Sequence, residues 1–183
     1  VYPKPINHLL ATKGKGIFED NCSKCHGKYG KDEYFPNKII SLDEIKTDPY
    51  YALYALQSPA NEWYNKSWFS QTNPKAYSQP SYGYMAPPLD GIWATAPYLH
   101  NGAVPTLSAL LNSKERPTYW KIEGEDTAYD YENIGRRYIN KSSGIGKKTY
   151  NSQFPRYGNQ GHTFSDSLTI DQREALIEYL KTL

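Results

Sequence analysis

The chain has 183 residues and a formal net charge of +2, and 38% of its residues are apolar. The length fits a single domain over residues 1–183. The small net charge excludes proteins that bind nucleic acid through a strongly basic surface, so we expect no nucleic acid among the partners. The longest mostly apolar stretch, Tyr50–Leu56, is far too short to cross a membrane, and we expect no membrane span.

The first predicted element is a helix over residues 11–21. Gly14, Ile17 and Phe18 are spaced three and four residues apart, as on one face of an amphipathic helix. The helix leads directly into the segment Asn21–Gly27, which contains both cysteines of the chain. A helix, rather than a buried strand, is therefore expected before the cysteines.

Cys22, Cys25 and His26 form the pattern CxxCH, which has three interpretations. A thioredoxin-like redox pair needs its CxxC at a junction from strand to helix, which the predicted helix before Cys22 does not provide. A structural zinc site needs four ligands, and the sequence has no second CxxC or HxxxH pair to complete one. The third interpretation is covalent attachment of haem, for which CxxCH is the signature.

We favour the third interpretation, one covalently bound haem c. The thiols of Cys22 and Cys25 would form thioethers with the haem vinyl groups, and His26 would bind the iron from one face as the proximal ligand. The two cysteines have no other cysteine with which to pair. A large apolar cofactor would also help a chain with a mean hydropathy of −0.77 to build a core.

Several short elements are expected between residues 41 and 111. Ser41–Glu44 has the spacing of a capping box, and Asp48 followed by proline predicts the start of a helix over residues 49–57. Residues 61–84 are rich in aromatic residues, Ser, Asn and Pro, and we expect an ordered loop, either over one haem edge or simply packed on the surface. A further short helix is expected over Thr106–Leu111, after a proline.

Residues 114–160 are expected to form a loop-rich insertion, because the segment is polar and contains several glycines. Its basic side chains are Arg136, Arg137, Lys141, Lys147, Lys148 and Arg156. These charges could form a patch that steers an acidic redox partner. We favour the simpler interpretation, a solvated loop whose charges contribute little.

The last predicted element is a helix over residues 169–183. Thr169 and Gln172 have the spacing of a capping box at its start. Its apolar stripe consists of Leu176, Tyr179, Leu180 and Leu183. Core packing alone would explain both this helix and the helix before the cysteines.

Together, the first helix, the CxxCH motif and the last helix resemble a class I c-type cytochrome. In that family the first and last helices cross beside the haem, and a glycine of the first lets an aromatic residue of the last approach closely. The resemblance implies that Gly14 and Tyr179 form this pair. It also implies a mainly α, class I cytochrome c-like helical fold around the haem, with long loops and an insertion.

The second axial ligand of the iron has three candidates. Met85 lies beside prolines, His100 lies in a turn-rich segment, and only six residues separate His162 from Thr169, where the predicted last helix begins. The remaining histidine, His8, precedes the first helix and is expected to be solvated. In class I cytochromes the distal ligand lies on the loop that enters the final helix. This position favours His162, while Met85 and His100 stay open.

A second resemblance lies in the block PLDGIWATAPYLHNGAVPTL, residues 88–107. The block is similar to a signature of cytochrome c domains related to rubber oxygenases, which are distant relatives of dihaem cytochrome c peroxidases. Further matches are Tyr129–Asp130, Ile134–Gly135, Gly158–Asn159, Gly161–His162 and residues 176–183. The likeness extends from Gly14 to the end of the chain and is looser over residues 114–155.

This resemblance implies roles for the three candidate ligands. The position of His162 recurs in the relatives and resembles the distal ligand of their C-terminal haem. The position of Met85 is usually not Met there, and His100 resembles a residue that braces the haem surroundings. The relatives carry two haems, whereas this chain has one CxxCH motif. The haem that carries out their oxygen or peroxide chemistry is missing, and what remains resembles their electron-relay half.

These observations predict an electron-transfer c-type cytochrome with one six-coordinate haem, held by Cys22, Cys25, His26 and His162. Redox proteins are the expected partners, and an electron carrier is favoured over an enzyme. One alternative is a haem enzyme, peroxidase- or oxygenase-like, if the distal position of the iron were open. Another is a haem subunit of a larger redox assembly, since a tyrosine-rich surface would suit self-association.

The expected location follows from the haem attachment. The sequence shows neither an initiator methionine nor a signal peptide, so we expect that a secretory signal has been removed or that the chain is an excised domain. Covalent attachment of haem c implies maturation outside the cytoplasm. We therefore expect a periplasmic location or an extracellular one at the cell surface.

Overall fold

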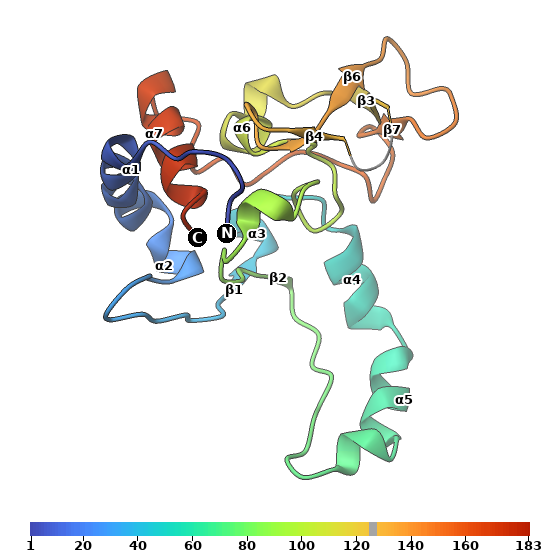
Figure 1. Cartoon of the computed structure of the whole chain (residues 1–183). Coiled ribbons are helices and arrows are strands. Elements are labelled where there is room, and N and C mark those ends of the chain that lie inside the picture. Colours follow the sequence, from blue (N-terminus) through green and yellow to red (C-terminus); the bar gives the residue numbers. More distant parts are fainter. Residues whose placement is uncertain (125–127) are drawn as a thin grey trace.

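The computed structural model describes residues 1–124 and 128–183. The helices are α1 (His8–Asn21), α2 (Ser23–His26), α3 (Leu42–Ile45), α4 (Tyr50–Gln57), α5 (Ala60–Lys66), α6 (Leu107–Leu111) and α7 (Ile170–Leu180), with 3-10 turns η1 (Phe69–Gln71), η2 (Ile92–Ala94) and η3 (Ser113–Glu115). The strands are β1 (Ile39–Ser41), β2 (Gly83–Met85), β3 (Tyr119–Ile122), β4 (Tyr129–Asp130), β5 (Gly135–Arg136), β6 (Tyr138–Asn140) and β7 (Tyr150–Asn151). Figure 1 shows their arrangement.

The expectation of a mainly α, class I cytochrome c-like fold is wrong. The chain is 34% helix and 13% strand. Its described residues form three small antiparallel sheets, with strand orders β1–β2, β6–β3–β7 and β4–β5. Residues 114–160, for which loops are expected, contain β3 to β7. These strands carry aromatic and branched residues such as Trp120, Ile139 and Tyr150, which favour extended backbone.

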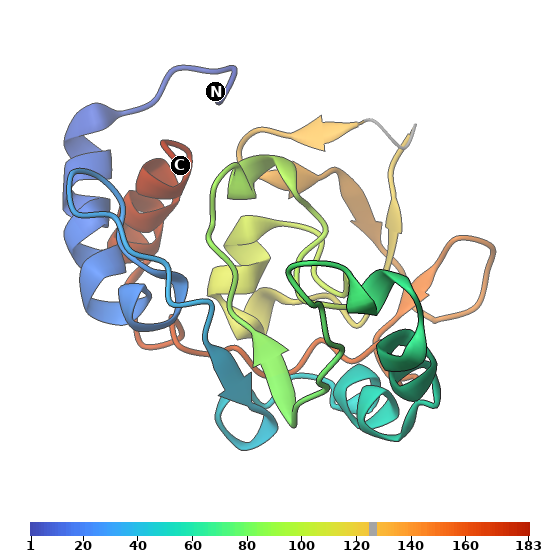
Figure 2. The ribbon, with the colours of Figure 1, turned by 90° about the horizontal axis from the view of Figure 1, so that it is seen from below.

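The two terminal helices pack closely against each other, as the sequence predicts (Figures 1 and 2). A Cβ atom added to Gly14 would lie 1.9 Å from the backbone oxygen of Ala175 and 2.9 Å from Cβ of Tyr179. Only glycine fits at this crossing, so the expected pairing of Gly14 with Tyr179 is confirmed. Phe18 and Leu176 are almost fully buried beside it, and they anchor the hydrophobic core.

Helix starts follow the predicted capping residues. The hydroxyl of Thr169 accepts a hydrogen bond from the backbone N–H of Gln172, and the Gln172 side chain accepts one from the N–H of Thr169. This capping box confirms the predicted start of α7. Helix α4 starts at Tyr50 with Pro49 at the N-cap, one residue later than predicted, and a carboxylate oxygen of Asp48 accepts a hydrogen bond from the N–H of Tyr50 at 2.9 Å.

The three-stranded sheet lies beyond α6 from the helix pair (Figure 1). Its central strand β3 places Trp120 in the interior, where the indole N–H donates a hydrogen bond to the backbone oxygen of Ala103 at 3.1 Å. The Tyr150 ring on β7 stacks on the Trp120 ring, with centroids 5.2 Å apart. The hydrogen bond from Trp120 attaches the sheet to the segment 88–107.

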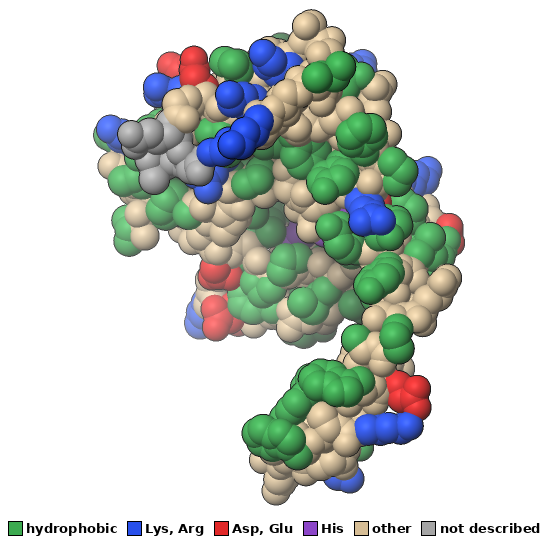
Figure 3. Space-filling view, turned by 90° about the vertical axis from the view of Figure 1, so that its right-hand side faces the viewer, with side chains coloured by type: hydrophobic (Ala, Val, Ile, Leu, Met, Phe, Trp, Pro, Cys, Tyr) green, Lys and Arg blue, Asp and Glu red, His purple; other side chains and the backbone are tan. Residues whose placement is uncertain are grey.

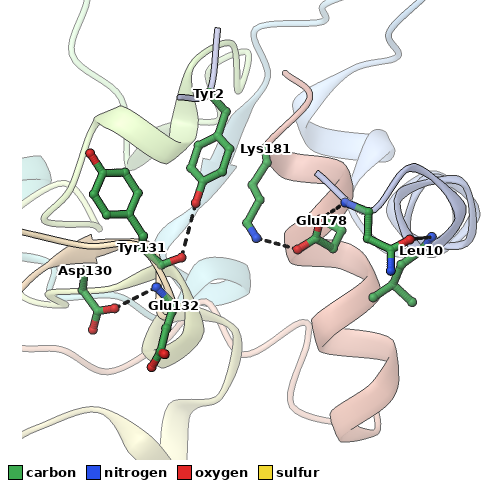
Figure 4. A network of polar contacts seen from close by, with 8 residues as sticks. Tyr2, Leu10, Asp130, Tyr131, Glu132, Glu178 and Lys181 are labelled. Carbon is green, nitrogen blue, oxygen red and sulfur yellow. Dashed lines mark hydrogen bonds and ion pairs between the residues drawn. The ribbon is translucent and has the colours of Figure 1, made fainter. Parts of the chain in front are cut away.

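The N-terminal segment, residues 1–7, connects helix α7 with the region of strand β4 (Figure 4). The Tyr2 hydroxyl donates a hydrogen bond to the backbone oxygen of Tyr131 at 3.3 Å, next to β4. The backbone N–H of Asn7 donates one to the carboxylate of Glu178 on α7 at 2.8 Å, and Lys181 forms an ion pair with Glu178. The segment therefore contacts both α7 and the chain next to β4.

Helices α4 and α5 form an arm that leaves the main body (Figures 1 and 3). The expectation of a loop over residues 61–84 is wrong in part, because α5, η1 and β2 lie within or overlap it. Trp63 and Trp68 of this arm are 66% and 81% exposed. Within the described residues, no helix has the length and apolar character needed to cross a membrane.

Candidate functional site

The cysteine motif occupies a one-turn helix that follows α1 directly. Cys22 donates its backbone N–H to the oxygen of Phe18 at 2.8 Å, and His26 donates its own to the oxygen of Cys22 at 3.0 Å. Gly27 ends this turn with φ of 90°, and a Cβ atom there would lie 2.4 Å from the backbone oxygen of Tyr34. Glycine is thus required immediately after the motif.

The two cysteines are free and half-buried. Burial, and to a smaller extent the neighbouring Cys25, raises the pKa of the Cys22 thiol to about 11. A redox-active CxxC pair instead has a lowered thiol pKa and follows a strand, whereas α1 precedes this motif. Among the described residues, no cluster of three or more His, Cys, Asp or Glu side chains could hold a metal ion by itself. The zinc interpretation therefore finds no ligand set there.

Among the described residues, the ring of His26 is hydrogen-bonded through Nδ1. Its Nδ1 lies 2.8 Å from the backbone oxygen of Pro87. Because a carbonyl oxygen only accepts, Nδ1 carries the proton and the lone pair is on Nε2. Burial lowers the pKa of His26, and the hydrogen bond to Pro87 opposes this shift. A histidine that donates one N–H to a carbonyl and keeps the other nitrogen free has the arrangement typical of metal ligands.

His162 lies in the loop 158–162, and the backbone there has a strained conformation. Its φ is 46°, in the left-handed region, which costs a residue other than glycine about 1–2 kcal/mol. The backbone N–H of His162 donates a hydrogen bond to the oxygen of Ile45 at 2.8 Å. A Cβ atom on the preceding Gly161 would lie 2.2 Å from the backbone carbon of Lys46. The loop is therefore pressed against the end of α3.

The side chain of His162 is an unusual one for a surface loop. Its Nδ1 is buried and has no hydrogen-bond partner among the described residues. Burial lowers the pKa of His162 to about 4, and the electrostatic influence of neighbouring His26 and Arg116 lowers it further. An unpartnered buried nitrogen on a neutral imidazole calls for an explanation, and a bound metal is one that suits neutral histidine.

The structure brings His26 and His162 together. Their ring centroids are 6.2 Å apart, and the ring planes are inclined at 58°. Two imidazoles that bind one metal ion from opposite sides through bonds of about 2 Å would place their centroids about 6 Å apart. These residues fit an iron held between two histidines.

The two other candidate ligands lie elsewhere. The His100 ring stacks on the Tyr84 ring, with centroids 3.9 Å apart and planes inclined at 15°, and it makes an edge contact with Tyr51. Met85 is 54% exposed on β2, opposite Ile39. Of the three candidates, His162 is the one whose side chain lies beside the ring of His26.

Two residues that shape the site are not evident from the sequence. Pro87 contributes a carbonyl oxygen, which no side-chain pattern reveals. Arg116 is buried and contacts the loop of His162 with its guanidinium group. The available signal for Arg116 is weak: it is one basic residue at the start of a segment rich in them.

Comparison with known proteins gives a partial family match. Residues 83–121, which hold Pro87, His100 and Arg116, match the model of RoxA-like, cytochrome c-like domains. The match supports a relation to cytochrome c-like domains, and it implies haem binding and a haem-related redox role.

Two similar proteins come from Sinorhizobium fredii, and both are named as uncharacterised proteins, y4iJ and y4iM. The first is 32% identical over 244 aligned positions, which cover 97% of this chain and 39% of the relative. The second is 28% identical over 219 positions, which cover 99% of this chain and 50% of the relative. The chain thus spans half or less of the length of each.

Proposed function

We propose that residues 1–183 form a haem domain that carries one covalently attached haem c and transfers electrons. The thioethers would form at Cys22 and Cys25, and His26 and His162 would be the two axial ligands. The observation that carries the proposal is the pair of imidazole rings, 6.2 Å apart, beside the CxxCH motif. The cytochrome c-like match supports the choice of haem over other cofactors.

The chain itself prepares both histidines to bind a metal ion. The hydrogen bond from Nδ1 to Pro87 fixes the tautomer of His26 that has its lone pair on Nε2. Burial lowers the pKa values of His26 and His162, which favours the neutral form of both rings. Protons therefore compete less for the nitrogen lone pairs.

The axial pair favours an electron carrier over a peroxidase- or oxygenase-like enzyme. When bound, the haem iron would supply one-electron oxidation and reduction. Two histidines would fill both axial positions and leave no position for a substrate. Histidine in place of methionine should also lower the reduction potential relative to His/Met cytochromes.

Redox proteins are the partners that this function requires. We place the domain in the periplasm or at the cell surface, because covalent attachment of haem c takes place outside the cytoplasm. Fractionation of cells of the source organism, with the chain detected by antibody, would test the location. Detection in the cytoplasm alone would contradict it.

The function is tested on the chain purified from a host that attaches haem c. Extraction with acidified acetone, followed by the pyridine haemochrome assay, measures how much haem is covalently bound. We expect one haem per chain that resists extraction. Visible spectra should show low-spin haem in both oxidation states, unchanged by carbon monoxide. Extractable haem would refute covalent attachment. Rapid carbon monoxide binding would favour a peroxidase- or oxygenase-like enzyme over an electron carrier.

A further inference from the structure

Arg116 has an exceptional environment for a charged residue. It follows η3, is 9% exposed, and donates hydrogen bonds to five backbone carbonyl oxygens. The acceptors are Ala109, Leu110, Asn159, Gly161 and His162. A buried guanidinium group is costly unless its N–H groups are well paired, and here backbone oxygens pair it.

The acceptors belong to two separate segments. Ala109 and Leu110 lie in the last turn of α6, where carbonyl oxygens have no partner within the helix. The other three lie in the loop 158–162. Arg116 donates to Gly161 at 2.6 Å and to His162 at 3.0 Å. One side chain therefore joins the loop to the end of α6.

His162 is held from two directions as a result. Its backbone N–H binds the oxygen of Ile45, and its backbone oxygen binds Arg116. Between these contacts the residue adopts its left-handed conformation. Because this conformation is unfavourable for histidine, the surrounding contacts must maintain it.

We infer that Arg116 is a positioning residue for the distal ligand: its guanidinium group holds the loop 158–162 so that the His162 ring stays opposite His26. This inference rests on the proposed function. Within the described part of the chain, the Arg116 guanidinium group hydrogen-bonds to the backbone of the loop and to neither imidazole ring, so it acts on His162 through that backbone. Lysine could not replace it, because an ammonium group lacks the planar set of five donors.

The chain offers a matched control in Arg173. Its guanidinium group also donates to backbone oxygens, those of Leu168 at 2.6 Å and Ser165 at 3.4 Å. These acceptors lie in the turn between His162 and α7. Loss of Arg173 should therefore disturb a neighbouring turn and leave the loop of His162 attached to α6.

The test compares the haem-loaded wild type with Arg116→Met, Arg116→Lys and Arg173→Met. Loss of hydrogen bonds from a charged donor should shift the equilibrium between bound and released His162 about tenfold or more. We expect both Arg116 variants to bind carbon monoxide at least about tenfold faster than the wild type and to lose low-spin ferric haem. Added imidazole should restore the low-spin spectrum. Arg173→Met should behave as the wild type.

Each outcome decides one question. If the wild type is high-spin or binds carbon monoxide readily, the proposed function fails before the variants are compared. If the wild type is low-spin and inert but both Arg116 variants match it, the inference about Arg116 is wrong. An equal change in Arg173→Met would also overturn it. If Arg116→Met fails to load haem, the inference is tested on Arg116→Lys, which keeps the charge. Its rate of carbon monoxide binding is then compared with that of the wild type.

Discussion

The rings of His26 and His162 lie 6.2 Å apart, yet the chain positions the two residues in opposite ways. The proximal segment, residues 22–26, is organised locally: a single helical turn continues α1 and presents both cysteines and His26. The distal loop, residues 158–162, has no regular structure, and contacts with α3 and α6 hold it. A site assembled from one local and one non-local part should respond differently to changes in each.

The largest effect is expected in the proximal segment. Replacement of Cys22 and Cys25 by serine should abolish nearly all covalent haem attachment, because serine cannot form the thioethers. Pyridine haemochrome assays after extraction measure the loss. Ser23→Ala is the control, since Ser23 lies between the cysteines and its hydroxyl donates a hydrogen bond to the backbone oxygen of Glu19 at 2.6 Å. Covalent haem in the double variant would contradict the assignment.

A change in the distal loop should keep the haem but open one axial position. His162→Ala is expected to retain covalent haem, to become high-spin in the ferric state, and to bind carbon monoxide within mixing time. Stopped-flow measurements with carbon monoxide check this. Controls are Met85→Leu and His100→Ala, which should remain low-spin because those side chains lie on β2 and against Tyr84. A low-spin His162→Ala variant with unchanged potential would refute the distal assignment.

The helix pair that joins the two parts allows a comparison of two glycines. Gly14→Ala should destabilise the protein by about 1–3 kcal/mol, because its Cβ atom would overlap the backbone of Ala175. Gly16→Ala should stabilise it by about 0.5–1 kcal/mol, since nothing lies within 4 Å of the added Cβ and alanine favours helix. Urea unfolding measures both. Equal effects would refute the close crossing of α1 and α7.

The smallest expected effect is the pH dependence contributed by Asp166, which follows the distal loop. Burial raises the pKa of this carboxyl, but hydrogen bonds from Ser113 and the charges of Arg116 and Arg173 outweigh it, and the pKa falls below its ordinary 3.8. A lowered pKa means that the stabilisation is complete above the ordinary value and is lost as the pH falls further.

Thermal unfolding of Asp166→Asn and the wild type should show this pH dependence. The wild type should be more stable at pH 7, and the difference should shrink as the pH falls below 3.8. The control is Asp171→Asn, at the exposed first turn of α7. A stability difference that does not change with pH would show that Asp166 acts only by its shape.

The predictable parts of the molecule are those encoded by neighbouring residues. The CxxCH motif, the capping box at Thr169 and both terminal helices follow from short spacings. Gly14 could be paired with Tyr179 because a class I cytochrome resemblance supplied the partner. His162 was selected on the same basis, through its place before the last helix.

The unpredictable parts depend on distant contacts. Strands β3 to β7 are two to four residues long, too short for an alternating pattern to stand out. Pro87 acts through its backbone, and Arg116 acts through carbonyl oxygens in two segments far apart in the sequence. Such roles belong to the folded chain and leave no spacing in the sequence. The mixed α and β composition could not be foreseen for the same reason.

The central claim is that His26 and His162 bind one haem iron from opposite faces. Near-infrared magnetic circular dichroism of the ferric haem-loaded protein tests it most directly, because the charge-transfer band identifies the pair of axial ligands. The account predicts the bis-histidine band in the wild type and its loss in His162→Ala. A histidine–methionine band, or a high-spin spectrum in the wild type, would contradict it.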